Sequence, residues 1–138
     1  MVVTLLGTRV FPRPNIYDVI MDLRAETQPF LHGEAHAGMV IGCKNILARC
    51  WESLREAVLA NPEYSVLVVG YSLGAGLAQL FTADLLDTAE LRSQLPPQTE
   101  IRALCYGAPP VFRAGDGGEH KVFPEIFILQ NNKDGIIA

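Results

Sequence analysis

A serine between glycines is the residue of this chain whose surroundings best suit covalent chemistry. Ser72 lies in Gly70-Tyr-Ser-Leu-Gly74, and an unbroken apolar run, Val66 to Val69, ends directly before this pentapeptide. A serine on a sharp strand-to-helix turn has a strained backbone, and its neighbours two residues away must be small so that the chain can double back. The pattern therefore predicts a nucleophilic hydroxyl at the end of a strand.

The segment after Ser72 is expected to form the helix that supports this turn. Its apolar residues recur at helical spacing: Leu77, Ala78, Leu80, Phe81 and Leu85. A helix that begins here leaves the backbone N–H of Leu73 unpaired, so this group can donate to an oxyanion. In the alternative interpretation this is an ordinary strand-to-helix turn, and the glycines serve packing alone. A nucleotide site is not expected, because Gly70, Gly74 and Gly76 do not make G-x-G-x-x-G and no lysine follows them.

A serine nucleophile also needs a base and an acid that orients the base. Asp134 follows a later apolar run, Ile126 to Leu129, and comes after Ser72, in the order Ser, Asp, His that one class of serine hydrolases uses. An Asx turn at residues 132–135 would favour the same residue types. The spacing alone leaves both interpretations of Asp134 open.

The base is harder to find, because all three histidines, His32, His36 and His120, precede that aspartate. His120 lies in a glycine-rich loop, where a solvated histidine is the ordinary expectation, and it is the weak candidate for the base. His36 stands directly before the longest predicted helix, as a capping or packing residue does. His32, Glu34 and His36 do not match H-E-x-x-H and the cysteines lack C-x-x-C spacing, so no metal site is expected.

Apolar runs that end in Gly, Pro or polar residues alternate with stretches of helical periodicity. The predicted strands are residues 2–6, 66–69, 101–106 and 126–129, and the predicted helices are residues 15–23, 38–58 and 73–87. This alternation is typical of an open parallel α/β sheet, whose site lies at the carboxyl ends of the strands. The residues expected to meet at that edge are Thr8, Ser72, Pro109 and Asp134.

Three stretches carry more local predictions. The run at residues 2–6 shows no alternation of apolar and polar residues, which predicts a central strand covered on both faces. Residues 24–35 contain Pro29 and Gly33 and fit an edge strand or a loop better than a core element. Residues 113–120 contain three glycines and are expected to be irregular surface.

Length and composition indicate one globular domain, residues 1–138, with a single core. The apolar runs are too short to span a membrane, and the scattered basic residues and net charge of −4 predict no nucleic-acid partner. The three cysteines cannot all pair, which favours buried thiols in a reducing compartment. Met1 is followed at once by strand-like residues, so no signal peptide is expected, and a cytoplasmic or membrane-associated location is favoured.

Together these residues resemble the class 3 (fungal-type) lipases, and within them the diacylglycerol-lipase-like branch. The stretches that carry the resemblance are Leu6-Gly-Thr8, Asp22-Leu23, His36-Ala-Gly-Met39, Gly70-Tyr-Ser-Leu-Gly-Ala-Gly76, Tyr106-Gly-Ala-Pro-Pro110 and Asn131-Asn-Lys-Asp134. They cover nearly the whole chain and are together far more specific than the pentapeptide around Ser72.

The resemblance implies an α/β-hydrolase fold, with a mostly parallel sheet flanked by helices. It implies Ser72 as the nucleophile and Asp134 as the acid of the triad. It also implies that the backbone N–H groups of Thr8 and Leu73 form the oxyanion hole. The implied substrate is an acylglycerol or related lipid ester, which makes a membrane or lipid-droplet surface a candidate partner, and no cofactor is expected.

Three features depart from the family pattern. Tyr71 stands where the family usually has His, and Arg9 stands where a small polar residue is common. The family's catalytic histidine lies well downstream of its aspartate, whereas this sequence stops at Ala138. We therefore expect an α/β-hydrolase domain that is incomplete at its C-terminus and lacks its base. The alternative is a non-catalytic remnant with no hydrolase activity of its own.

Overall fold

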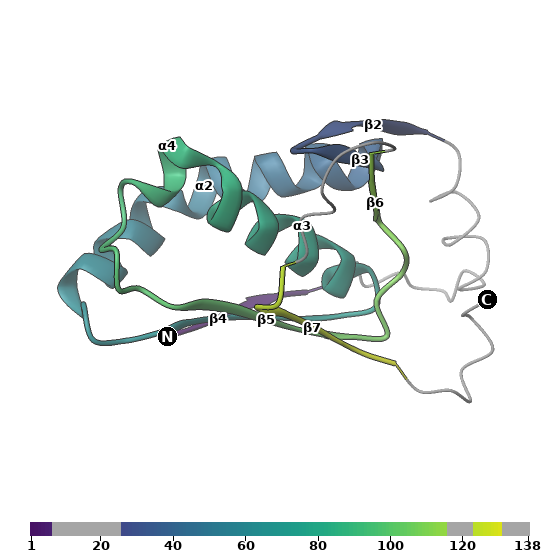
Figure 1. Ribbon diagram of the computed structural model, residues 1–138. Helices are drawn as coiled ribbons and strands as arrows, with labels where there is room; N and C mark the ends of the chain where they lie inside the picture. The colour runs from purple at the N-terminus through teal and green to yellow at the C-terminus, as the bar shows by residue number, and fades with distance from the viewer. Residues whose placement is uncertain (7–25, 116–122, 131–138) are drawn as a thin grey trace.

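The computed structural model describes residues 1–6, 26–115 and 123–130. Within these residues, a large sheet, a small sheet and three helices form the fold (Figure 1). The predicted helix over residues 15–23 and the predicted turn at 132–135 lie outside the described residues.

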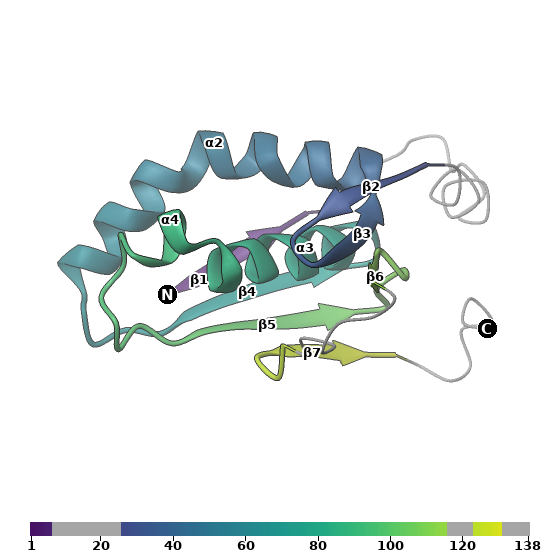
Figure 2. The ribbon, with the colours of Figure 1, turned by 45° about the horizontal axis from the view of Figure 1, so that its top comes forward.

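Four parallel strands form the large sheet. In sheet order they are β1 (Val2–Leu5), β4 (Val66–Tyr71), β5 (Ile101–Tyr106) and β7 (Ile126–Leu129). Their carboxyl ends lie at the same edge of the sheet (Figure 2). The prediction of an α/β fold built on a parallel sheet is therefore confirmed, together with the positions of its four strands.

The prediction that the first strand is central is wrong. Among the described strands β1 pairs with β4 alone, so it lies at an edge of the sheet. Val2 is 63% exposed, and Leu6, directly after the strand, is 81% exposed. An unbroken apolar run shows that both faces of a strand carry apolar side chains, but it does not show that other elements cover both faces.

Three helices lie on one face of the large sheet (Figure 1). They are α2 (Ala37–Ala60), α3 (Leu73–Asp87) and the short α4 (Ala89–Arg92). Helix α2 ends at the predicted Asn-Pro pair, where the side chain of Asn61 donates a hydrogen bond to the Ala57 carbonyl at 2.8 Å. Of the helices in the described part of the chain, none is long and apolar enough to cross a membrane.

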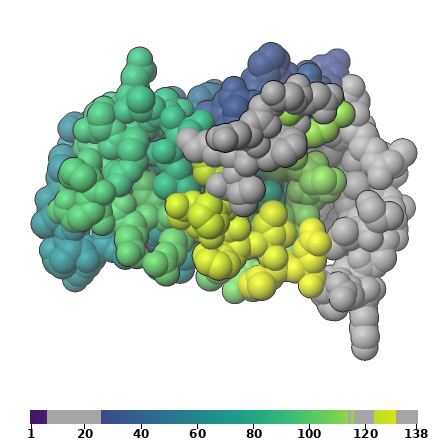
Figure 3. Space-filling model, viewed as in Figure 1, coloured from purple at the N-terminus to yellow at the C-terminus, as the bar shows by residue number. Residues whose placement is uncertain are grey.

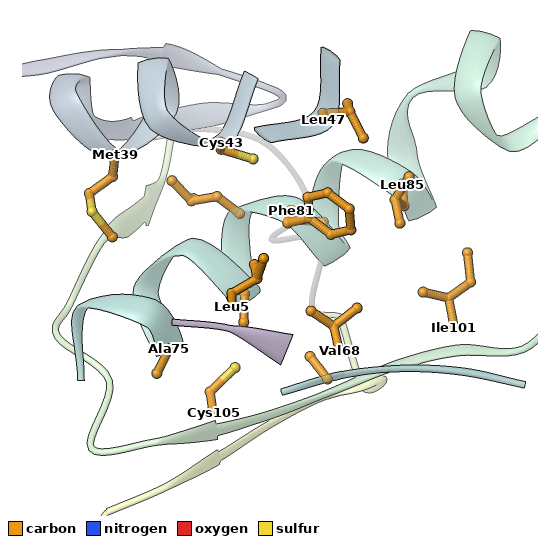
Figure 4. Packing of buried hydrophobic residues seen from close by; sticks show 14 of the residues in the cluster. Leu5, Met39, Cys43, Leu47, Val68, Ala75, Phe81, Leu85, Ile101 and Cys105 are labelled. Carbon is orange, nitrogen blue, oxygen red and sulfur yellow. The ribbon is translucent and has the colours of Figure 1, made fainter. Parts of the chain in front are cut away.

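The hydrophobic core lies between these helices and the sheet (Figure 4). Alternate residues of β4 and β5 point into it, because successive side chains of a strand face opposite sides. These buried strand residues are Val66, Val68, Ile101, Ala103 and Cys105. The helices contribute side chains at helical spacing, among them Cys43, Leu47, Phe81 and Leu85. This packing holds the end of β4 against the first turn of α3.

A small antiparallel sheet joins the chain before α2 to the chain after β5. Its order is β2 (Thr27–Phe30), β3 (Gly33–His36) and β6 (Phe112–Ala114). The edge position of β2 agrees with Pro29, which has no N–H for a neighbouring strand. The prediction for residues 24–35 was incomplete, since Phe30 and Ala35 are buried in the core. Strand β6 was missed because three residues carry too little pattern to reveal a strand.

A buried carboxylate joins the two long helices. Asp84 of α3 is fully buried, and its Oδ2 accepts a hydrogen bond from Nζ of Lys44 of α2 at 2.7 Å. Its Oδ1 accepts from the Thr88 hydroxyl at 2.5 Å. A carboxylate removed from water needs such partners, because an unpaired buried charge is strongly unfavourable.

Replacing Lys44 by methionine should therefore destabilise the fold. Removal of one partner of a buried ion pair costs roughly 3–5 kcal/mol, and we expect about 3 kcal/mol because Lys44 is itself half exposed. Urea unfolding measures this loss. Arg55→Met is the control on the same helix, because it removes only an exposed pair with Glu52 and should change stability little. Equal effects of the two substitutions would contradict the assignment.

Candidate active site

Ser72 stands at the turn between β4 and α3 in a left-handed backbone conformation. Its φ is 53° and its ψ is −121°, and among the described non-glycine residues only Leu31 also has a positive φ. A side chain with a Cβ adopts this region at a cost of about 1–3 kcal/mol, and such strain is typical of functional sites. The predicted strand, sharp turn and helix are thus all present around Ser72.

Three backbone hydrogen bonds, one to β5 and two from α3, hold the strained turn. The N–H of Ser72 donates to the carbonyl of Tyr106, at the end of the neighbouring strand β5, at 2.9 Å. The carbonyl of Ser72 accepts from the N–H groups of Ala75 and Gly76 at 2.9 and 3.2 Å. Sequence reasoning did not single out Tyr106 for this role, because a backbone acceptor leaves no mark on residue type.

Gly70 is required by the close approach of the helix to the strand end. A Cβ at this position would overlap the carbonyl group of Gly74 and lie 2.7 Å from the Cα of Ala75. Both obstacles are backbone atoms of the first turn of α3, so they cannot rotate away. The interpretation of Gly70 as the small residue that lets the chain double back is supported by this geometry.

Two polar groups of the turn, the hydroxyl of Ser72 and the N–H of Leu73, have no partner among the described residues. The side chain of Ser72 makes no capping hydrogen bond to α3, although it occupies the N-cap position. The N–H of Leu73, in the first turn of α3, has no acceptor within the described ranges. The start of a helix carries a partial positive charge, which favours an anion beside these groups.

Apolar side chains surround this edge of the sheet. Tyr71 is 72% exposed, and it pairs in register with Tyr106 of β5, which pairs with Leu129 of β7. Leu6, directly after β1, is also exposed. Figure 3 shows β7 at the surface in one view of the molecule. These four exposed side chains, the apolar row, thus lie at or directly after the carboxyl ends of the four strands, the edge of the sheet at which Ser72 lies.

His36 acts as the N-cap of α2, as its place in the sequence predicted. Its Nδ1 accepts a hydrogen bond from the N–H of Met39 at 3.2 Å. A neutral imidazole with an accepting Nδ1 carries its proton on Nε2. In this form His36 has no lone pair on Nε2 with which to take a proton from a serine.

His32 lies far from Ser72. Its Nδ1 is 3.7 Å from the carboxylate of Asp87, the last residue of α3, whereas Ser72 precedes the first residue of the same helix. The 15 residues of α3 rise about 1.5 Å each, so the two ends are roughly 20 Å apart. The ring of His32 packs against Phe112 and Phe123, which suits a partly buried structural residue.

The remaining predicted site residues lie outside the described residues. They are Thr8, Asp134 and His120. Their expected roles as oxyanion donor, acid and candidate base therefore stay predictions. Of the residues expected at the edge of the sheet, Ser72 and Pro109 are brought together, since the ring of Pro109 lies against Gly76 in the first turn of α3.

Comparison with known protein families identifies the family of this chain. A profile of the family described as Lipase (class 3) matches residues 2–136. The chain belongs to the class 3 lipase family. A search of curated proteins found no match to this lipase-family chain.

Solved structures of lipases share the fold. The lipase of Rhizopus microsporus var. chinensis is 24% identical with a TM-score of 0.65, and the match covers 80% of this chain and 37% of that one. Lipase II of Rhizopus niveus is 24% identical with a TM-score of 0.59, and the match covers 70% of this chain and 36% of that one. Lip2 lipase of Yarrowia lipolytica is 22% identical with a TM-score of 0.61, and the match covers 80% of this chain and 38% of that one. The chain thus spans less than two-fifths of each of these structures.

The cysteines of this lipase-family chain are poor nucleophiles. Burial raises the pKa of the Cys105 thiol to about 11, and burial together with the Asp84 carboxylate raises that of Cys43 to about 12. Burial also raises the pKa of Cys50. All three are free thiols, as predicted, and they stay protonated at neutral pH. Within the described residues no group of His, Cys, Asp and Glu could hold a metal ion.

Proposed function

We propose that this chain carries the nucleophile of a serine hydrolase that cleaves carboxylic ester bonds of acylglycerol-type lipids. The observation that carries the proposal is the left-handed backbone of Ser72 at the start of α3, with a hydroxyl that does not cap the helix. Strain of this kind persists only where the surrounding structure enforces it. Membership of the class 3 lipase family supports the same chemistry.

In the proposed reaction, the Oγ of Ser72 attacks the ester carbonyl carbon while a base accepts the hydroxyl proton. The carbonyl oxygen becomes an oxyanion, and we expect the N–H of Leu73 and the partial positive charge of the α3 N-terminus to stabilise it. Collapse of this intermediate breaks the bond to the leaving alcohol, which takes the proton from the base. Water then hydrolyses the acyl-serine ester, with the same base accepting its proton.

The partners of Ser72 are proposed from the family resemblance. Asp134 would orient the base, and the N–H of Thr8 would be the second donor of the oxyanion hole. Within this chain His120 is the candidate base, since His36 caps α2 and His32 lies at the far end of α3. A histidine further along the natural protein is the alternative that the family pattern implies.

The apolar row beside Ser72 supports a lipid ester over a polar ester as substrate. Its members are Leu6, Tyr71, Tyr106 and Leu129, and all four are exposed. Contact with an acyl chain would remove the leucine side chains and the tyrosine rings from water, which favours an apolar substrate. The diacylglycerol-lipase-like branch, and a membrane or lipid-droplet surface as partner, are part of this proposal.

Labelling with a fluorophosphonate tests the proposal directly. This reagent phosphonylates an activated serine, and mass spectrometry of the digested protein then identifies the modified residue. We expect the label on Ser72 itself and on neither Ser65 nor Ser93, as fragmentation of the labelled peptide shows. A label distributed over several serines, or no label in the natural full-length protein, would contradict the proposal.

A second candidate function is a domain without hydrolase activity of its own. It is favoured by the two described histidines, neither of which is arranged to accept the proton of Ser72. Without a base the serine hydroxyl is protonated and a weak nucleophile, although an oxyanion hole and binding alone can leave roughly 10³–10⁴-fold catalysis over water. Comparing p-nitrophenyl ester turnover by this chain and by the natural full-length protein separates the candidates. Equal turnover would make His120 the leading base.

Thr8 offers a prediction about the second oxyanion donor. Loss of one such donor lowers turnover on the order of 10²–10³-fold. Thr8→Pro removes the backbone N–H and should approach that loss, whereas Thr8→Ala keeps the N–H and should cost less. Turnover of a p-nitrophenyl ester by both variants of the full-length protein measures the difference. Small and equal effects of the two substitutions would contradict the role of the Thr8 N–H as an oxyanion donor.

A further inference from the structure

We propose that Met39 is a positioning residue for Ser72. Its side chain supports the first turn of α3 through a contact that glycine at position 76 permits. The proposal rests on the proposed function, since it concerns how the same nucleophile is held. Met39 belongs to α2 and would act on Ser72 through α3, without touching the substrate or Ser72 itself.

Gly76 is enclosed by two other segments of the chain. A Cβ at this position would lie 2.6 Å from Cε of Met39 and 2.8 Å from Cγ1 of Val111. It would also lie 3.4 Å from the ring of Pro109. The start of α2 and the loop after β5 therefore meet at Gly76, and a methyl group there would fit only if these side chains or the first turn of α3 shifted.

The backbone of Gly76 leads directly to the nucleophile. Its N–H donates a hydrogen bond to the carbonyl of Ser72 at 3.2 Å. The N–H of Leu73 belongs to the same helical turn, which has a fixed geometry once its hydrogen bonds are formed. A displacement of Gly76 therefore moves both the strained serine and the candidate oxyanion donor.

Met39 is itself held in place. It is buried, and its N–H donates to Nδ1 of His36, the N-cap of α2. The N–H of His36 donates to the carbonyl of Val111 at 3.0 Å. These hydrogen bonds fix Met39 and Val111 relative to each other, so both sides of the enclosure around Gly76 belong to one connected unit. Figure 4 shows Met39 reaching from α2 toward the layer that contains α3.

Ordinary core packing is the competing explanation, and it makes different predictions. A buried methionine that only fills space would lower stability when truncated but would leave each folded molecule fully reactive. A positioning residue would lower the reactivity of folded molecules as well. A misplacement of about 1 Å can cost on the order of 10²-fold in rate, so the two explanations are separable.

The experiment measures kinact/KI for a fluorophosphonate and kcat and KM for a p-nitrophenyl ester, in the natural full-length protein and per folded molecule. Met39→Ala should lower kinact/KI and kcat by about tenfold or more and leave KM within about twofold. Leu54→Ala is the matched control, because Leu54 is similarly buried on α2 but lies four turns further along the helix. It should lose stability with kcat unchanged. If Met39→Ala does not fold, Met39→Val provides the same comparison with a smaller change.

A double-variant cycle tests the contact itself. Gly76→Ala alone should displace the first turn of α3 and lower kcat. In the double variant, the shortened residue 39 removes the nearer of the two obstacles to the new methyl group and only Val111 remains, so kcat should exceed that of Gly76→Ala alone. Residues in contact give such non-additive effects, whereas independent residues do not. Strictly multiplicative losses would overturn the proposal.

The remaining outcomes are equally decisive. If Ser72 of the unmodified protein is labelled and Met39→Ala is labelled at the same rate per folded molecule, only the role of Met39 is overturned. If Ser72 of the unmodified protein is not labelled at all, the proposed function fails, and the positioning role fails with it.

Discussion

Replacing Ser72 by alanine should reduce ester hydrolysis by the natural full-length protein to near background. Removal of the nucleophile of a serine triad lowers turnover by about a millionfold at the limit. The substitution removes only the hydroxyl, which makes no capping hydrogen bond, so α3 should form as before. Turnover of p-nitrophenyl esters and fluorophosphonate labelling measure the loss, and thermal unfolding shows that the fold is retained.

Ser93→Ala is the matched control for that result. Ser93 is exposed after α4, and its hydroxyl donates only to the Glu90 carbonyl at 3.2 Å. Its removal should leave turnover unchanged. If Ser72→Ala retains activity within about tenfold of the unmodified protein, Ser72 is not the nucleophile, because such a residual rate is far above what binding and an oxyanion hole alone provide.

Gly70→Ala should have the second largest effect, although the residue takes no part in the chemistry. The new methyl group would overlap the carbonyl of Gly74, and neither backbone can move without opening the turn. Overpacking typically costs about 1–3 kcal/mol, and we expect at least the upper end because the obstacle is backbone. Guanidinium unfolding should show this loss, and the molecules that still fold should hydrolyse esters at least about 10²-fold more slowly.

Gly42→Ala separates this steric effect from the general effect of replacing glycine. Gly42 lies within α2, and a Cβ there would be 3.4 Å from the side chain of Leu77, an ordinary contact distance. Alanine is a better helix former than glycine by about 0.5–1 kcal/mol, so this variant should be slightly more stable. A similar loss of stability in both variants would show that Gly70 is not specially constrained.

The parts of the fold with a long, regular pattern could be predicted from the sequence. Helix α2 and the β4 to α3 unit were predicted because apolar residues repeat over many residues, and both ends of α2 carry capping residues, His36 and Asn61. The turn at Ser72 could be predicted because its steric demand fixes the residue types around it. The N–H of Leu73, unpaired within the described residues, follows from the same local geometry.

The features that depend on distant segments could not be predicted. Whether β1 is central or at an edge depends on what lies beside it, and β6 is a strand only because β3 provides its partner. The enclosure of Gly76 by Met39 and Val111 joins three separate segments, and no residue type marks such a contact in advance. For Thr8, Asp134 and His120 the predictions rest on the sequence alone.

The hydrogen bond from Ser72 to Tyr106 also has a consequence for the order of folding. Strand β4 and helix α3 can form from neighbouring residues, but the turn between them obtains one of its restraints only when β5 docks beside β4. Parallel pairing of strands distant in sequence is slow, because the chain between them must close a loop first. We therefore expect a growing polypeptide to expose its complete serine motif before that serine is reactive, with the reactive geometry appearing when β5 joins the sheet.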